Sequence, residues 1–446
     1  MENREEIRTE YLLIGNSAGA VGTAEAIREV DKAGSLTIVS DEPYPAYSRP
    51  LISEYLAGEC TVDGMLFRPA DFYDRNNIDL LLGKKAKSLG LNRRVVQLES
   101  GERIAWSKLL LATGGVPIVP KMRGMDKKGV FTFLTLEDAK AIADFIHDAS
   151  QAVVIGGGLI GISVTEALTK RGVSVTIVEM KDRVLNTILD EEASSIVEES
   201  LKQEGVGIIT NQTAAEIIGE SSTEGVILDN GDRMACELVV IAIGVLPRTE
   251  LVLDTNIKVN RGIVVDRHMS TSYEDVYSCG DAAEAYDFIY GANRLTPIWP
   301  NAHIGGRVAG YNMAGITTEY LGGTAMNSLN YFGLDIATAG TVTPQDDGSC
   351  EVISRRKNGV YQKVILNNDL VVGMVFIREI EKSGMIFGLM RDRVNVSGFK
   401  QELLADDFGL ACFPQELRRE RLGTVPAGAT LVSATPAEVE EPIAAG

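Results

Sequence analysis

The hydrophobic positions of this chain gather in short runs, and several of these runs end abruptly at glycine. Tyr11-Leu12-Leu13-Ile14 leads into a glycine-containing turn and an alanine-rich stretch, and Ala152-Val153-Val154-Ile155 leads into a similar turn farther along. Apolar runs of this length, bounded by turns, are typical of strands buried on both faces. The pattern therefore predicts a strand, a tight turn and a helix over residues 9–30, a next strand over 35–39, and a second such unit from about residue 152 to 244.

Both turns have the spacing of a dinucleotide-binding fingerprint. The second reads Gly156-Gly157-Gly158-Leu159-Ile160-Gly161, and its unit ends in Glu179. The first reads Gly15-Asn16-Ser17-Ala18-Gly19-Ala20, and Asp41 follows its next strand. One such turn is weak evidence, because glycine-rich turns between a strand and a helix are common. Two of them, each in a strand–turn–helix–strand–acid unit, indicate that one chain binds two dinucleotides.

The rest of the pattern predicts a third, C-terminal unit. Further strands are expected over residues 95–103 (a hairpin), 109–115, 238–243, 276–281, 337–343, 361–367 and 370–377. A helix is expected from residue 300, and the alternating strands beyond residue 322 predict an α+β domain. The tail over residues 423–446 is rich in Ala, Pro, Thr and Glu, and we expect it to be disordered.

Composition and charge narrow the class of protein. The chain has 446 residues, 45% of them hydrophobic, and a net charge of −19, which argues against nucleic acid or an anionic membrane as a partner. The longest apolar stretch, residues 238–246, is too short to span a bilayer. The polar, acidic N-terminal residues do not resemble a signal peptide, so a cytoplasmic location is expected. The five cysteines form no C-x-x-C pair and the three histidines lie far apart, so no metal site is expected.

The residue types in the two turns suit the binding of pyrophosphate and ribose. Glycine lets the backbone turn tightly and approach a pyrophosphate, whose charge then lies at a helix N-terminus. In the first turn Ser17 replaces the second glycine, and its hydroxyl is expected to donate to the phosphate, while Ala20 replaces the third. Asp41 and Glu179 stand where a carboxylate accepts ribose hydroxyls. Because Glu179 would repel a 2′-phosphate, NAD(H) is favoured over NADP(H).

With further motifs these residues resemble a known superfamily. The motifs are both fingerprints, Ala112-Thr113-Gly114, Gly244 with Pro247, Gly280-Asp281, and the loop from Tyr47 to Ser53. The chain is similar to FAD-dependent pyridine nucleotide–disulfide oxidoreductases, and within them to NADH–rubredoxin and ferredoxin reductases. The resemblance implies two Rossmann-like domains of the glutathione-reductase type: an FAD-binding domain over residues 1–115 and 247–320, and an NAD-binding domain over 116–246. A C-terminal α+β interface domain would follow over 321–422.

The resemblance also implies the site residues by position. Asp281 would bind the ribityl chain of FAD and Trp299 would lie against its isoalloxazine, with the helix that follows pointing its positive end at the flavin. No catalytic side chain is expected, because hydride transfer needs only stacked rings. The implied FAD-binding residues are Gly15, Ser17, Ala18, Gly19, Ala20, Asp41, Arg49, Pro50, Ala86, Ala112, Thr113, Gly114, Gly280, Asp281, Trp299 and Ala302. The implied NAD-binding residues are Gly156, Gly158, Leu159, Ile160, Gly161, Glu179 and Gly244.

These features predict an oxidoreductase that exchanges a hydride between NAD(H) and FAD, and single electrons between FAD and an iron–sulfur protein. Similar chains include FAD subunits of multi-subunit oxidoreductases, so a place in a hetero-oligomer is expected, with the basic cluster of Arg418, Arg419 and Arg421 as a contact. One alternative is an NADH oxidase or peroxidase, although the reactive cysteine of such relatives, expected near residues 40–50, is absent from this sequence. Another is a flavin-bearing structural subunit with a vestigial NAD site. The acceptor and the direction of electron flow stay open.

Overall fold

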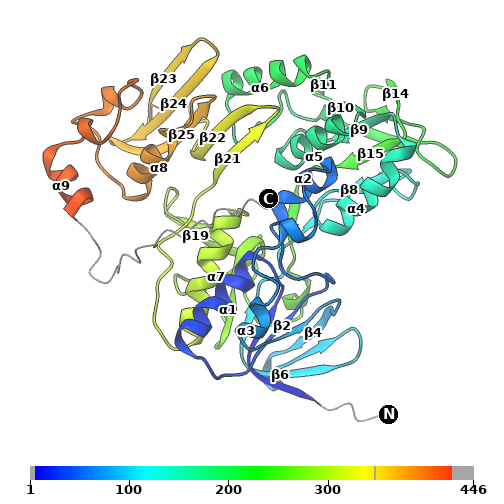
Figure 1. The fold of residues 1–446 in the computed structure, drawn as a ribbon, viewed down its shortest axis with the longest axis vertical. Coiled ribbons are helices and arrows are strands. Elements are labelled where there is room, and N and C mark those ends of the chain that lie inside the picture. Colours follow the sequence, from blue (N-terminus) through cyan, green and yellow to red (C-terminus); the bar gives the residue numbers. More distant parts are fainter. Residues whose placement is uncertain (1–5, 346–347, 424–446) are drawn as a thin grey trace, which may run out of the picture.

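The computed structural model describes residues 6–345 and 348–423. Figure 1 shows three bodies: one contains both α1 and α7, a second contains α5, and a third is built around the C-terminal strands. The predicted disordered tail falls almost entirely outside the described residues.

The first body is built on a mixed sheet with strand order β3-β2-β1-β6-β5-β4, in which β18 also pairs with β6. β1, β2, β6 and β18 run parallel, and Ile14, Val39, Leu111 and Ser278 lie in register near their carboxyl ends. Helices α1 and α7 pack closely against each other beside this sheet (Figure 1). The elements are β1 (Ile7–Ile14), α1 (Ala18–Val30), β2 (Leu36–Val39), α2 (Ile52–Ala57), α3 (Phe72–Arg75), β3 (Ile78–Leu81), β4 (Ala86–Gly90), β5 (Val95–Leu98), β6 (Arg103–Leu111), β17 (Ile263–Val264), β18 (Val276–Ser278), β19 (Ala283–Asp287), β20 (Ala292–Arg294) and α7 (Trp299–Met313).

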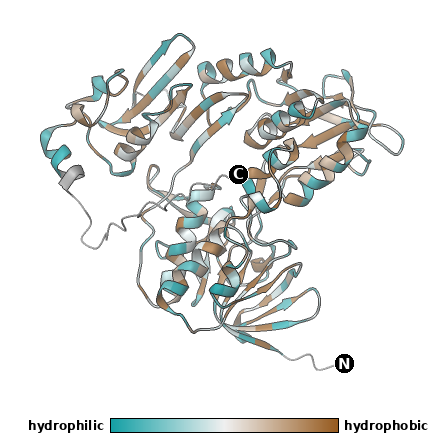
Figure 2. Cartoon of the chain, viewed as in Figure 1, coloured by the Kyte–Doolittle hydropathy of each residue, from teal (hydrophilic) through white to brown (hydrophobic). Residues whose placement is uncertain are grey.

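The second body repeats this plan with a fully parallel sheet of order β11-β10-β9-β15-β8. Its strand β9 is apolar after its first residue, and every residue of β15 is apolar and buried (Figure 2). An antiparallel meander of β12, β13 and β14 adds to it, and its last hairpin turns at Asn230-Gly231. The elements are β8 (Val130–Thr132), α4 (Leu136–Phe145), β9 (Gln151–Ile155), α5 (Leu159–Lys170), β10 (Ser174–Glu179), α6 (Glu191–Gln203), β11 (Gly207–Thr210), β12 (Ala214–Ile218), β13 (Gly225–Leu228), β14 (Arg233–Ala235) and β15 (Leu238–Ile241).

The chain crosses between these two bodies through a pair of short antiparallel strands. β7 (Gly115–Pro117) pairs with β16 (Val245–Pro247), and Gly115 lies opposite Pro247. A loop over residues 43–51, which contains Pro43, Pro45 and Pro50, leads into α2 of the first body. Helix α2 packs against α4 and α5 of the second body. The crossing therefore places the two sheets beside each other with the loop between them.

The C-terminal body is an antiparallel sheet of order β21-β22-β25-β24-β23 with α8 on it. Three of its strands were predicted, whereas β21 and β23 were missed because polar residues interrupt the apolar pattern of β21 and most residues of β23 are exposed. The elements are β21 (Met326–Tyr331), β22 (Leu334–Gly340), β23 (Glu351–Lys357), β24 (Val360–Asn367), β25 (Leu370–Ile377), α8 (Ser383–Arg391) and α9 (Gln415–Gly423).

The predicted fold class is confirmed: two Rossmann-like α/β sheets and a C-terminal sheet domain. The domain limits assigned from the sequence stay a prediction. Within the described ranges, no helix is both long enough and apolar enough to cross a membrane.

Candidate functional site

The first glycine turn joins β1 to α1 at the carboxyl edge of its sheet. Gly15 N donates to the carbonyl of Val39 at 2.8 Å, and Gly15 has φ +113°. A Cβ at Gly15 would lie 2.1 Å from the Ala112 oxygen, so this position requires glycine. Ser17 is the N-cap of α1, yet its side chain makes no hydrogen bond within the described part of the chain. Its hydroxyl is therefore available to a phosphate at the helix N-terminus.

The second turn repeats this geometry between β9 and α5. Gly156 has φ +107°, and a Cβ there would lie 2.4 Å from the Ala242 oxygen. A Cβ at Gly161 would lie 1.9 Å from the Gly156 oxygen. Around Gly158, by contrast, no atom of the described chain lies within 4 Å of the Cβ position. Packing therefore explains the first and third glycines, and the second leaves open space where a pyrophosphate can approach the backbone.

The two acids that follow the turns have different partners. Glu179, 8% exposed, accepts from the backbone N–H of Gly157 at 2.7 Å and of Lys181 at 2.8 Å. Asp41 instead forms an ion pair with Arg248, with Nη1 and Oδ2 2.6 Å apart. The backbone thus fixes the Glu179 carboxylate, whereas Asp41 is held by the side chain of Arg248, which directly follows β16 of the crossing.

Sequence reasoning missed Arg248. Its backbone is fixed at the crossing, because Arg248 N donates to the Gly114 carbonyl at 2.9 Å and Thr113 Oγ1 donates to the Arg248 carbonyl at 2.6 Å. Gly114 and Gly244 both have positive φ, +71° and +124°, at this crossing. The sequence likeness between residues 112–114 and 244–249 marks the crossing, and Arg248 directly follows Pro247 in the second of these segments.

Arg49 lies near enough to Asp281 for their charges to interact. Arg49 donates through Nη1 to the Leu134 carbonyl at 2.8 Å and pairs through Nη2 with Glu42 at 2.6 Å. Burial raises the pKa of the Asp281 carboxyl, and the Arg49 guanidinium acts in the opposite direction. Among the described residues no donor hydrogen-bonds to the Asp281 carboxylate. A partly buried carboxylate without a donor suits a ligand that brings hydroxyl groups.

Helix α7 begins beside Asp281. Trp299 is its first residue, and the Trp299 ring meets the Phe67 ring edge-on at 5.0 Å between centroids. Gly280 has φ +72°, and a Cβ there would lie 3.5 Å from the Ala302 Cβ. The N-terminus of this helix is therefore directed at the strand edge that holds Asp281, where it favours negative charge.

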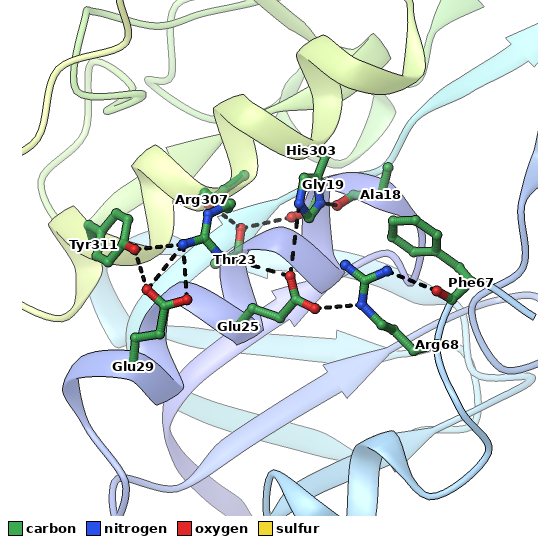
Figure 3. Close-up of polar contacts among 11 residues, drawn as sticks. Ala18, Gly19, Thr23, Glu25, Glu29, Phe67, Arg68, His303, Arg307 and Tyr311 are labelled. Atoms are coloured by element: carbon green, nitrogen blue, oxygen red, sulfur yellow. Dashed lines mark hydrogen bonds and ion pairs between the residues drawn. The ribbon is translucent and has the colours of Figure 1, made fainter. Parts of the chain in front are cut away.

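A clasp holds α7 against α1, and Figure 3 shows its polar contacts. Thr23 Oγ1 donates to the Gly306 carbonyl at 2.8 Å. A Cβ at Gly306 would lie 2.0 Å from the Gly19 oxygen, so the two backbones touch. Along the outer edge, Arg307 pairs with Glu29 at 2.9 Å. The clasp sets the N-terminus of α7 relative to the first glycine turn, and no sequence motif predicts it.

The remaining predicted residues lie near the same edges. Ala86 begins β4, close to Lys84, whose N–H donates to the Ser40 carbonyl at 2.7 Å beside Asp41. Pro50 lies in a single 3-10 turn, Arg49–Leu51, directly before α2. Ala18, Gly19, Ala20, Leu159 and Ile160 lie in the first turns of α1 and α5, and Ala112, Thr113 and Gly114 follow β6. The structure thus gathers the predicted residues around two strand edges, whereas their roles stay predictions.

Two of the five cysteines, Cys236 and Cys279, are buried. Burial raises the pKa of both Cys236 and Cys279 to about 12, so these thiols stay protonated at neutral pH. Within residues 6–345 and 348–423, no group of three or more His, Cys, Asp or Glu residues is placed to hold a metal ion.

Comparison with known proteins identifies the class that this geometry defines. The family model described as "Pyridine nucleotide-disulphide oxidoreductase" matches residues 9–306, and that of the "Rubredoxin NAD+ reductase C-terminal domain" matches 326–394. The chain belongs to the pyridine nucleotide-disulphide oxidoreductase family. Enzymes of this family bind FAD and NAD(H), so the predicted family, enzyme class and cofactor pair are confirmed.

Three relatives illustrate the range of proteins that share this fold. The chain is 30% identical over 403 residues to NADH-dependent phenylglyoxylate dehydrogenase subunit epsilon of Aromatoleum evansii, covering 89% of this chain and 95% of that one. It is 28% identical to nitrite reductase [NAD(P)H] of Bacillus subtilis over 87% of its own length, but it spans only about half (48%) of that protein. The crystal structure of NADH:rubredoxin oxidoreductase from Clostridium acetobutylicum matches with a TM-score of 0.73 at 26% identity, over 88% of this chain and 97% of that one.

Proposed function

We propose that this chain is the NAD-reactive flavoprotein subunit of a larger redox enzyme and exchanges electrons between NAD(H) and an iron–sulfur partner. The observation that carries this proposal is the pair of glycine turns, each open to a dinucleotide at a helix N-terminus, on two sheets joined by one crossing. The match to subunit epsilon over nearly the full length of both chains supports the role of a separate subunit. The rubredoxin oxidoreductase relative supports an iron–sulfur acceptor.

FAD fits the first body. We assign its pyrophosphate to the turn around Ser17, its ribityl chain to Asp281, and its ring to the N-terminus of α7 beside Trp299. When bound, FAD can take a hydride from a nicotinamide and release electrons singly. Arg49 and Asp281 would orient it, and the positive end of α7 would favour negative charge on it. The Arg248–Asp41 pair lies where the adenosine half would end, so Arg248 is a further candidate contact.

NAD(H) fits the second body in the same way. We assign its pyrophosphate to the amides around Gly158 and its adenosine ribose to Glu179, whose oxygens are already oriented by two backbone N–H groups. Gly244 at the crossing would bring the nicotinamide half of NAD(H) toward the first body.

A cytoplasmic location stays a prediction. So does the docking contact, because the side chain of Arg421 and the tail beyond it fall outside the described part of the chain.

An anaerobic titration with NADH tests the oxidoreductase role. The purified protein should be yellow, and NADH should bleach the flavin without oxygen turnover when air is admitted. Rapid oxygen consumption would favour an NADH oxidase, and a flavin that NADH does not bleach would favour a vestigial nucleotide site.

Purification from the native source tests the subunit role. An iron–sulfur subunit should co-purify, and a chain that purifies alone and reduces free ferredoxin at full rate would contradict it.

Replacing Asp281 tests the FAD assignment. Removing a buried hydrogen-bonding acceptor costs about 1–3 kcal/mol, so Asp281→Ala should weaken FAD binding about ten- to a hundredfold. Asp281→Asn keeps one acceptor oxygen and should weaken binding less. Flavin content after gel filtration at low protein concentration measures the difference. If Asp281→Ala retains its full flavin, Asp281 does not hold the ribityl chain.

A further inference from the structure

The hairpin of β21 and β22, in the C-terminal body, contacts helix α5 of the second body. Its two-residue turn, Phe332-Gly333, has positive φ at both positions, +50° and +73°. Tyr331, just before this turn, is 7% exposed and belongs to the same hydrophobic core as Ile162 of α5. The N–H of Phe332 donates to the Glu166 carboxylate at 3.2 Å. Figure 1 shows the β21–β22 hairpin directed toward α5.

The Tyr331 hydroxyl bonds to the first turns of α5. It lies 3.1 Å from Ser163 Oγ and donates to the Leu159 carbonyl at 3.3 Å. Ser163 Oγ also donates to the Leu159 carbonyl, at 3.0 Å. Burial raises the pKa of Tyr331 to about 12, so the phenol keeps its proton at neutral pH and remains a donor. Leu159 is the first residue of α5, directly after the second glycine turn.

This cluster lies where all three bodies meet. Leu159, Ser163 and Glu166 are spaced to share one face of α5. Helix α2 of the first body packs against α5, and the Glu54 carboxylate on α2 helps raise the pKa of Tyr331, so the first body reaches this cluster too. A dinucleotide anchored at Glu179 and on the glycine turn must extend its other half toward the first body, because hydride transfer requires the two rings to touch. That path passes the first turns of α5 on the side facing α2.

We propose that Tyr331, from the C-terminal body, is a positioning residue for the nicotinamide half of NAD. Its hydroxyl holds the Ser163 side chain in place, and the Ser163 hydroxyl can turn its one proton from the Leu159 carbonyl to the carboxamide oxygen. Ser163 is partly exposed and can contact a ligand, whereas Tyr331 acts through it. The inference rests on the proposed binding of NAD(H) to the second body and assigns the C-terminal body a part in it.

A second tyrosine provides a matched control. Tyr361 on β24 also joins the C-terminal body to the second body, and its hydroxyl donates to Asp190 Oδ2 at 2.7 Å. Asp190 caps α6, and the same carboxylate accepts from Lys363 Nζ at 2.7 Å. Tyr361→Phe therefore removes one hydroxyl from the same interface but leaves the glycine turn untouched. It reports what loosening of the interface alone does.

The test compares NAD+ with ADP-ribose, which lacks the nicotinamide, by calorimetric titration of the FAD-loaded protein. Tyr331→Phe should weaken NAD+ binding about three- to tenfold, the loss expected for one neutral hydrogen bond, and should leave ADP-ribose binding within about twofold. Ser163→Ala should behave alike, and the double variant should be little weaker than either single variant because the two hydroxyls act as a unit. Tyr361→Phe should change neither affinity.

The outcomes distinguish a failure of the role of Tyr331 from a failure of the proposed function. If the unsubstituted protein binds no NAD+, the proposed function fails. If it binds NAD+ but Tyr331→Phe affects both ligands equally or neither, only the inference fails. A selective loss of NAD+ affinity in Tyr361→Phe would also overturn it. Should Tyr331→Phe lose its flavin or its fold, Ser163→Ala decides the question by the same ligand comparison.

Discussion

Replacing Gly306 with alanine is expected to release FAD and destabilise the protein, whereas the same change at Gly305 should do neither. A Cβ at Gly306 would lie 2.0 Å from the Gly19 oxygen, a backbone atom in the first glycine turn. Because backbone cannot yield as a side chain can, α7 must shift away from α1, and such overpacking costs about 1–3 kcal/mol. The shift also moves the N-terminus of α7 relative to the turn, so flavin affinity should fall with stability.

Gly305 is the matched control because it lies one residue earlier on the same helix. A Cβ there would first meet Met269 Cε, 3.0 Å away, at the flexible end of a side chain. Alanine also gains up to about 1 kcal/mol of helix propensity over glycine at both positions, so the difference between the variants isolates the close contact. Thermal unfolding and flavin content measure it. Equal stability and flavin content in the two variants would show that the clasp does not set the site.

The parts of the site that the sequence predicted are those encoded locally. A glycine turn between a buried strand and a helix needs only adjacent residues, so Gly156 and Gly161 could be read from their spacing, and the structure shows the contact behind each one. The Rossmann-like sheets followed from the same short apolar runs. In the C-terminal body, β23 was not predicted because most of its residues face solvent and form no apolar pattern.

The contacts that join distant segments could not be predicted in this way. Thr23 and Gly306 are 283 residues apart, and Asp41 and Arg248 are 207 residues apart. Nothing in the local pattern around either partner specifies the other, because a polar side chain on a helix surface is usually solvated. The Tyr331 hydroxyl belongs to the same group. It reaches α5 only because the C-terminal sheet packs on the second body, which no single segment encodes.

The largest effect on nucleotide choice is expected at Glu179. Its carboxylate is nearly buried and fixed by the N–H groups of Gly157 and Lys181, so it cannot swing away from a 2′-phosphate. Two like charges about 4 Å apart repel by up to about 4 kcal/mol at the effective dielectric constant near a protein surface. We therefore expect the unsubstituted protein to prefer NADH over NADPH by about a hundredfold or more in kcat/KM, which corresponds to about 2.7 kcal/mol.

Two substitutions separate the charge of Glu179 from its hydrogen bonds. Glu179→Gln removes the charge but keeps an acceptor for one of the two N–H groups, so the preference should narrow to within about tenfold while NADH still binds. Glu179→Ala also removes the acceptor for the Gly157 N–H in the glycine turn. It should therefore narrow the preference for NADH over NADPH and weaken the binding of NADH by roughly the value of a buried hydrogen bond, about 1–3 kcal/mol. Asp41→Asn, the equivalent change after the first turn, should leave the preference unaltered because that acid is assigned to FAD. Equal kcat/KM for NADH and NADPH in the unsubstituted protein would refute the role of Glu179, and a changed preference in Asp41→Asn would refute the assignment of the two turns to different dinucleotides.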